Sequence, residues 1–276
     1  MMRSSLEIHS LATGQTRVVL QTDALIAAPN FHPSGRWLLV NGDGRLYRVP
    51  LDNPALHQID IPPDLHCNND HGFLQGGTVI FSAHRGHGAE IFRLDPQGPT
   101  LLSPHSPSWF HATSPDGRSM TYAAARQNRI VDIYVKPFDG AEQSLTQGEG
   151  HCDAPDFSAD GKSIFYNSDR SGHAQIWVMK ADGTGQRQLF HDTSVNWFPH
   201  PSPDGKHLLY LAYPTGTQGH PSNLQVTLTL TTPTGTTPRP IVTLTGGQGT
   251  INSPPWSPDS TQFAFIRFAP DTTQAP

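Results

Sequence analysis

One phrase recurs six times along the chain, and this repeat constrains the fold more than any other feature of the sequence. It consists of an aromatic or small residue, then Ser-Pro-Asp-Gly or a variant of it, and then a short apolar run. A fixed period is typical of architectures in which each unit buries its apolar face against the next unit. The six copies lie at 31–40, 73–81, 114–122, 157–166, 202–210 and 256–265.

The spacing of the repeats predicts a ring of four-stranded units. From Gly35 to Ser260 the successive turn positions lie 42, 40, 44, 44 and 55 residues apart, which suits propeller blades of about 40–45 residues. In the Ser-Pro-Asp-Gly form of the turn, Pro sets φ, Asp caps the turn with its carboxylate, and Gly takes the left-handed conformation that closes the hairpin. The turn joins an inner strand, A, to a second strand, B, and we assign a structural role to its aspartate.

The outer strands, C and D, indicate how the ring closes. After the fourth repeat they are expected at 176–180 and 187–190, but only a short tail follows the sixth repeat, whereas a matching phrase stands at 8–14 and 16–20. We therefore predict an all-β, six-bladed β-propeller of four-stranded blades, in which the N-terminal strands complete the last blade and protect the sheet edges. The single domain spans 1–276, with blade 1 at 25–61, blade 2 at 68–103, blade 3 at 107–147, blade 4 at 151–191, blade 5 at 195–245, and blade 6 at 250–268 and 5–20.

This repeat resembles the WD40-like repeats of TolB and of the propeller domains of prolyl-oligopeptidase-type enzymes. The resemblance covers 5–268 and implies the architecture, whereas functional sites are grafted onto such folds. Two departures are expected: the chain has neither a leader nor room for the extra N-terminal domain of TolB, and it lacks the G-x-S-x-G motif of the hydrolases. The chain is also similar to the oligogalacturonate lyases, propellers with histidines around a divalent metal. Their blade number differs, so no residue is transferred from them.

Composition and charge exclude several classes of partner. Only 15% of the residues are charged and the net charge is −5, so we expect no nucleic-acid partner and no binding to an anionic membrane. No apolar segment is long enough for a signal peptide or a membrane span. Cys67 and Cys152 form neither a disulfide framework nor a C-x-x-C pair. We therefore expect free thiols and a cytoplasmic location.

The A strands should place polar side chains at one mouth of the central channel, where the D-to-A and B-to-C loops gather. Because side chains alternate along a strand, residues two apart are expected to point the same way. Six residues before the turn glycine four blades have Pro, whereas two have His71 and His111, an exception that favours a local role. Eight residues before the turn, counted from Ser260 in the last blade, stand Ala27, Asn69, Trp109, Asp153, Trp197 and Asn252.

Histidines gather in the loops that map to this same face. The chain has 15 histidines, and most of them fall on these loops. The segment 246–250, which contains Gln248, is rich in glycine and would bring backbone close to a ligand. The loops near the A strands add Asn68, Asp70, His151, Asn196 and His200, and the B-to-C loops add His84, Arg85, His87, Arg126, Arg170, His173 and His220.

Three consecutive blades supply the candidate catalytic residues His71, His111 and His151, with Asp153 close to the last of them. Imidazole binds Mn, Zn and Fe, so the three histidines are also candidate ligands of one divalent metal. Without a metal they would act as acids and bases near neutral pH. Their spacing matches no diagnostic metal or phosphate motif, and the alternative is that they are loop residues with satisfied hydrogen bonds.

The remaining candidates are ligand-binding residues. Trp109 and Trp197 would stack on a sugar ring or else plug the channel, and Arg170 would bind an acid group or pair within its loop. We predict a site for a small polar ligand of carbohydrate or uronate type and, if the protein is an enzyme, a lyase or hydrolase. The alternative is a non-catalytic platform for a protein partner. The full set is Asn69, Trp109, Asn196, Trp197, His200, Gln248, Asn252 and Arg170.

Overall fold

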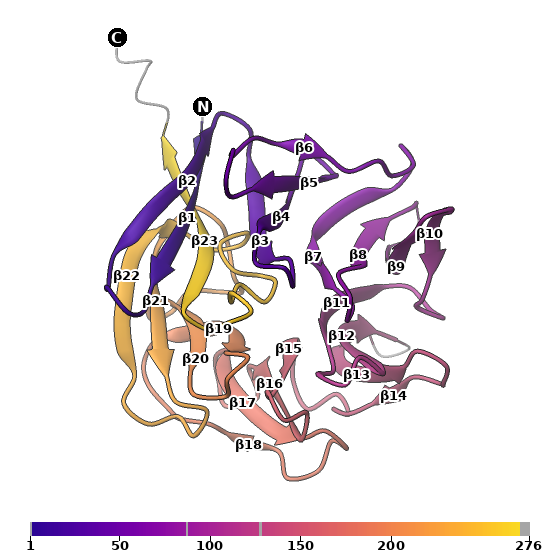
Figure 1. The fold of residues 1–276 in the computed structure, drawn as a ribbon. Helices are drawn as coiled ribbons and strands as arrows, with labels where there is room; N and C mark the ends of the chain where they lie inside the picture. The colour runs from indigo at the N-terminus through magenta and orange to yellow at the C-terminus, as the bar shows by residue number, and fades with distance from the viewer. Residues whose placement is uncertain (1, 87, 127–128, 271–276) are drawn as a thin grey trace.

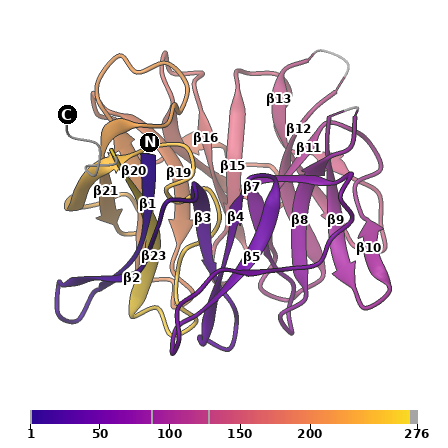
Figure 2. The ribbon, with the colours of Figure 1, turned by 90° about the horizontal axis from the view of Figure 1, so that it is seen from above.

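Six sheets surround a central axis. The computed structural model describes residues 2–86, 88–126 and 129–270, and this part of the chain consists of strands, turns and loops. It contains no helix long and apolar enough to cross a membrane. Figure 1 looks onto the ring, and Figure 2 shows its blades from the side. The predicted six-bladed β-propeller is confirmed.

Blades 1 to 5 are four-stranded antiparallel sheets whose strands follow one another in the chain. Blade 1 consists of β3 (Ile26–Phe31), β4 (Trp37–Gly42), β5 (Arg45–Pro50) and β6 (His57–Gln58), and blade 2 of β7 (His66–Phe73), β8 (Val79–His84), β9 (Ala89–Asp95) and β10 (Gly98–Leu101). Blade 3 consists of β11 (Ser108–Thr113), β12 (Ser119–Ala125), β13 (Val131–Pro137) and β14 (Gln143–Ser144). Blade 4 consists of β15 (Cys152–Phe157), β16 (Ser163–Ser168), β17 (Gln175–Lys180) and β18 (Arg187–Gln188), and blade 5 of β19 (Val195–Pro201), β20 (Leu208–Tyr213), β21 (Leu224–Thr231) and β22 (Arg239–Gly246).

Blade 6 joins the two ends of the chain, as the sequence predicted. β1 (Met2–Ser10) lies between β23 (Gln262–Pro270) and β2 (Thr16–Thr22), and its pairing with β23 runs without a break over nine residue pairs. The inner part of this blade is irregular rather than a strand. It is held by the bridge between Trp256 and Phe263 and by a hydrogen bond from the Ile266 amide to the Thr250 carbonyl (3.1 Å).

The recurring Ser-Pro-Asp-Gly phrase forms a hydrogen-bonded turn. In blade 3 the Asp116 carboxylate accepts hydrogen bonds from the Ser114 hydroxyl (2.5 Å) and the Arg118 amide (3.0 Å), and Gly117 has a φ of +69°. The same serine and aspartate contacts recur at Ser158–Asp160, Ser202–Asp204 and Ser257–Asp259. These aspartates are therefore used in the turns, and this explains why the repeat needs them.

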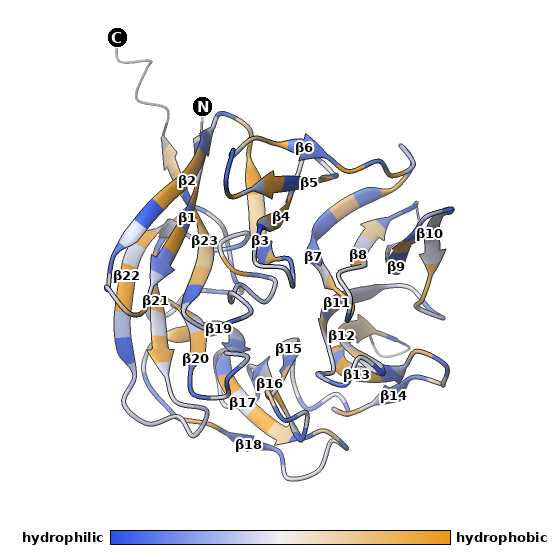
Figure 3. Cartoon of the chain, viewed as in Figure 1, coloured by the Kyte–Doolittle hydropathy of each residue, from blue (hydrophilic) through white to orange (hydrophobic). Residues whose placement is uncertain are grey.

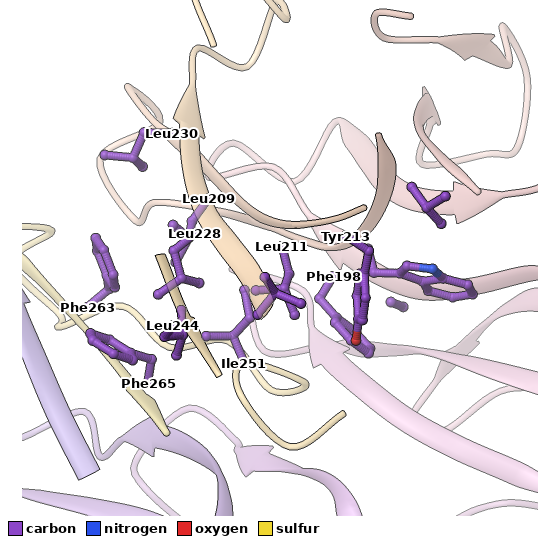
Figure 4. Close-up of a cluster of buried hydrophobic side chains, with 14 of the residues drawn as sticks. Phe198, Leu209, Leu211, Tyr213, Leu228, Leu230, Leu244, Ile251, Phe263 and Phe265 are labelled. Carbon is purple, nitrogen blue, oxygen red and sulfur yellow. The ribbon is translucent and has the colours of Figure 1, made fainter. Parts of the chain in front are cut away.

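Apolar side chains pack between neighbouring blades. Figure 3 shows hydrophobic residues along the strands of the blades, and Figure 4 shows the cluster between blades 5 and 6, with Phe263 and Phe265 on one side and Phe198 and Tyr213 on the other. A second cluster joins blade 6 to blade 1, and Leu6 and Ile8 of β1 contribute to it from the N-terminus. The first strand therefore closes the ring through both its ladder and its packing.

Loss of the β1 packing should destabilise the whole ring. Leu6 is fully buried, and we expect Leu6→Ala to lower the free energy of unfolding by about 2–5 kcal/mol. The matched control is Val18→Ala on β2, where the side chain is 52% exposed and the expected change is within about 0.5 kcal/mol. Urea denaturation measures both. Equal stability of the two variants would contradict the role of β1 in closure.

Candidate functional site

A pocket of about 450 Å³ lies at one mouth of the channel, and we call it the upper pocket. The inner strands and the loops that precede them supply most of its lining. It combines amide, imidazole and carboxylate groups with the faces of two aromatic rings. Its lining residues are Asn41, Cys67, Asn68, Asn69, Asp70, Trp109, His111, Val131, His151, Asp153, Phe198, His220, Gln248 and Asn252.

Asp153 lines this pocket, and three histidines converge on it. His111 Nε2 lies 3.1 Å from Oδ1, whereas His151 Nε2 and His220 Nε2 lie 3.6 and 3.8 Å from Oδ2. The Asp153 side chain is only 17% exposed, while His151 and His220 are 42% and 28% exposed. The carboxylate is thus held inside, and two of its histidines face solvent.

The histidine contacts determine the charge of the group. Burial by itself would raise the pKa of Asp153, but hydrogen bonding to His111 and His151 holds that pKa well below its usual range. Burial would lower the pKa of His111, yet the hydrogen bond and the charge of Asp153 raise it. The contact with Asp153 also raises the pKa of His151, against the effect of burial. The contacts therefore favour an ionised carboxylate beside protonated imidazoles.

A second carboxyl group in the pocket has the opposite behaviour. Burial raises the pKa of Asp70 to about 7, and the charge of Asp153 raises it further, while His111 acts against both. The pocket thus contains one carboxylate that stays ionised and one that exchanges its proton near neutral pH. Such a division is typical of sites that move protons.

Burial also raises the pKa of Cys67 to about 12, so its thiol stays protonated.

Seven of the twelve residues proposed from the sequence line the upper pocket. They include three of the four candidate catalytic residues, and the amides among them are already partly engaged. Asn69 Oδ1 accepts a hydrogen bond from Asn41 (2.8 Å), and Asn252 Oδ1 accepts one from the Gly249 amide (2.6 Å). The seven are Asn69, Trp109, His111, His151, Asp153, Gln248 and Asn252.

β-Bulges in the inner strands change the direction of the side chains. The pairing of A with B shifts register in each of blades 1 to 5, and Ala28, Ala154 and Phe198 have positive φ within these shifts. A bulge breaks the alternation of faces, so residues two apart need not point together. Trp109 and His111 both line the upper pocket, whereas His71 does not follow Asn69 into it. The expectation that His71 and His111 share one face is therefore not met.

His71 lies outside the upper pocket. Its ring is fully buried, and Nε2 lies 3.3 Å from Asn41 Oδ1. Burial lowers the pKa of His71 to about 3, so the ring is neutral. Because the ring is buried outside the upper pocket, it has no access to a ligand there. In the part of the chain that the structure describes, no group of three His, Cys, Asp or Glu side chains is placed to hold a metal ion. The proposed trio of His71, His111 and His151 is thus not assembled as a ligand set.

Four other candidates are used inside the blades. Asn196 is fully buried and bonds Gln175 and Asp192. Trp197 packs behind the pocket, with its ring 4.4 Å from that of His220.

His200 and Arg170 are engaged in the same way. His200 Nε2 donates to the Ile251 carbonyl (2.7 Å), while Nδ1 lies 2.9 Å from Asp156. Arg170 donates to Glu149 (2.7 Å) and Gln186 (2.8 Å), so its guanidinium is not directed into the pocket.

The structure adds residues that were not among the twelve proposed for the site. His220 was named from the sequence only as one of several histidines in the B-to-C loops. Asn41 follows an apolar run in β4. A polar residue at the end of such a run is the sequence feature that could have indicated its place in the pocket. His87 lies outside the described residues.

The pKa of Asp70 makes a prediction about stability. Because this pKa is raised from 3.8 to about 7 in the fold, deprotonation disfavours the native state, and stability is lost as the pH rises from about 4 to about 7. Asp70→Asn removes this loss, so its stability relative to the wild type should increase over that window and level off above it. Denaturation at several pH values tests this, with the exposed Asp64→Asn as control. A constant difference between Asp70→Asn and the wild type would contradict the burial of Asp70.

Known proteins resemble this chain over nearly its whole length. An uncharacterised protein of Agrobacterium fabrum is 41% identical, over 98% of this chain and 94% of its own. The solved structure of a candidate TolB from Agrobacterium tumefaciens is 40% identical, with a TM-score of 0.95 over 98% of this chain and all of its own. TolB from Acinetobacter baumannii is 18% identical, with a TM-score of 0.69 over 89% of this chain and 64% of its own.

A more distant likeness concerns the lyases, and it extends to the fold alone. An oligogalacturonate lyase in complex with manganese is 13% identical, with a TM-score of 0.55 over 86% of this chain and 72% of its own. The family model described as the TolB beta propeller domain matches residues 101–233. Together with the long match to the Agrobacterium protein, this match shows that the chain belongs to the TolB-like β-propeller family.

Proposed function

We propose that the upper pocket binds a small polar ligand of the carbohydrate class that carries an acid group, such as a uronate. The observation that supports this most strongly is the convergence of His111, His151 and His220 on Asp153. Two of these rings have raised pKa values and would supply the positive charge that an acidic sugar needs. Among the described lining residues there is no lysine or arginine, so the histidines take the place that we expected Arg170 to have.

The other lining groups suit the rest of such a ligand. The side-chain amides of Asn68, Gln248 and Asn252 supply donors and acceptors for hydroxyl groups. Gln248 Oε1 is buried and has no hydrogen-bond partner among the described residues, so it is an acceptor that a ligand would satisfy. The indole of Trp109 supplies a flat apolar face against which a sugar ring stacks.

We propose that the ligand contacts the histidines directly rather than through a divalent metal. The support is that no group of three His, Cys, Asp or Glu side chains among the described residues is placed to hold a metal ion, and that the three histidine Nε2 atoms of the pocket lie against the Asp153 carboxylate. If the bound ligand reacts, His151 would act as the acid, because its ring is partly exposed, Asp153 orients it, and its raised pKa favours the protonated form. Asp70 would be the group that carries a proton near neutral pH.

Binding of galacturonate, compared with galactose, tests the proposal. Calorimetry at pH 6 should show at least tenfold tighter binding of the uronate. That preference should decrease as the pH is raised from 6 to 8.5, because loss of protons from His111 and His151 removes their positive charge. Trp109→Ala and His151→Gln should each weaken binding at least tenfold. His84→Gln, an exposed histidine outside the pocket, is the matched control.

Equal binding of both sugars, or binding that survives both pocket substitutions, would contradict the proposal. Elemental analysis of protein purified without chelator accompanies the titration. A stoichiometric metal that is lost in His111→Ala would overturn the proposal that the ligand contacts the histidines without a metal. Whether the uronate binds at all is decided by the titration.

A second candidate function is a platform for a protein partner, and the observation that favours it is the match to the TolB propeller domain. The described surface speaks against it, because its exposed large hydrophobic residues, Val18, Leu25 and Leu101, are few. Affinity capture with wild type and Trp109→Ala distinguishes the two functions. A stoichiometric protein partner lost in the variant would favour the platform.

A further inference from the structure

A second pocket lies at the opposite mouth of the channel, and we call it the lower pocket. It has a volume of about 400 Å³, and residues of all six blades line it. The A-to-B turns form its rim, whereas the upper pocket is formed by loops at the other ends of the strands. His111 contributes to the lining of both pockets and separates them.

The walls of the lower pocket come from the repeat itself. Four residues before the turn glycine, or before Ser260 in blade 6, stand the aromatic side chains of Phe31, Phe73, Phe157 and Trp256, all of which line the pocket. Prolines of the turns complete the rim, among them Pro33, Pro115, Pro203 and Pro258. Turn formation explains why these residues recur in the repeat. Because the six turns surround the central axis, they also enclose a cavity whose walls are flat apolar groups.

Two buried polar atoms in this lining lack partners. Asn30 Oδ1 and His111 Nδ1 have no hydrogen-bond partner among the described residues, although both side chains are about 95% buried. The other polar atom of each is in use, since Asn30 Nδ2 donates to the Pro254 carbonyl (2.6 Å) and His111 Nε2 bonds Asp153. Buried polar groups in native proteins are normally paired, so these two atoms are available to a molecule bound in the lower pocket.

We propose that the lower pocket is a second binding site, for a small planar and mostly apolar molecule that carries a carboxamide. The aromatic and proline walls match a flat ring. A carboxamide supplies N–H groups for Asn30 Oδ1, and its donors and acceptor suit either proton arrangement of the His111 ring. Nothing in this assignment depends on the ligand of the upper pocket, so the two proposals fail or succeed independently.

Thr113 offers a substitution that closes the lower pocket. It occupies the position that is aromatic in four of the other blades, and it lines the pocket. Thr113→Phe follows the pattern of the repeat, so the blade should tolerate it while the new ring occupies the cavity. Thr113→Ser is the matched control, because it keeps the hydroxyl that donates to the Phe73 carbonyl (3.2 Å) and leaves the cavity open.

Titration of benzamide, followed by ligand-observed NMR, tests the proposal. We expect saturable binding to the wild type with a Kd on the order of 1 mM, at least tenfold weaker binding to Thr113→Phe, and unchanged binding to Thr113→Ser and to Trp109→Ala of the upper pocket. N,N-dimethylbenzamide lacks the N–H donors and should bind wild type at least fivefold more weakly.

Four results would overturn the proposal. They are the absence of saturable binding to the wild type, equal binding to Thr113→Phe, equal binding of the two amides, and loss of binding in Trp109→Ala. If Thr113→Phe does not fold, the comparison of benzamide with N,N-dimethylbenzamide on the wild type tests the proposal instead. Binding that is lost in Trp109→Ala instead would assign the benzamide to the upper pocket and contradict the lower site.

Discussion

The pairing of β1 with β23 is the constraint on which both pockets depend. A propeller has a central axis only when its first and last blades are joined, and this chain joins them within one sheet. Glu7 on β1 also forms a bidentate ion pair with Arg267 on β23 (2.8 and 3.0 Å). If that sheet opened, the segment 248–252 would move away from Asn69 and Asp153, because it is held through the blade that contains β1. Closure thus links the stability of the fold directly to the geometry of the upper pocket.

The fold could be predicted from the sequence because its signals are local and repeated. A turn such as 114–117 needs particular residues at particular places, and six copies at a near-constant period leave few alternatives to a ring. The N-terminal phrase at 8–20 matched a missing pair of strands, so even the closure was indicated by pattern. What remained hidden was the irregular inner segment of blade 6, where two prolines, Pro254 and Pro255, interrupt a regular ladder.

The site could be predicted only in part, and the β-bulges explain the limit. Asp153, His111 and Trp109 were found because the inner strands were expected to place them at the mouth, and all three line the upper pocket. His71 was misplaced, because the shift between Cys67 and His71 turns it into the interior. The approach of His220 to Asp153 joins residues 67 positions apart. It depends on how the loop after β20 folds back over Phe198, which no local pattern encodes.

His111 connects the chemistry of the two mouths of the channel. Its Nε2 is used by Asp153, so the stability of that ion pair keeps the ring in place, and its Nδ1 remains unpaired on the ring's other side. Removing one member of a buried charged pair leaves the other uncompensated. The histidine is therefore fixed by the site above it, and whatever contacts its free nitrogen from below meets a group of set orientation. His111 is the residue that the linings of the upper and lower pockets have in common, so the two cavities share a wall at this side chain.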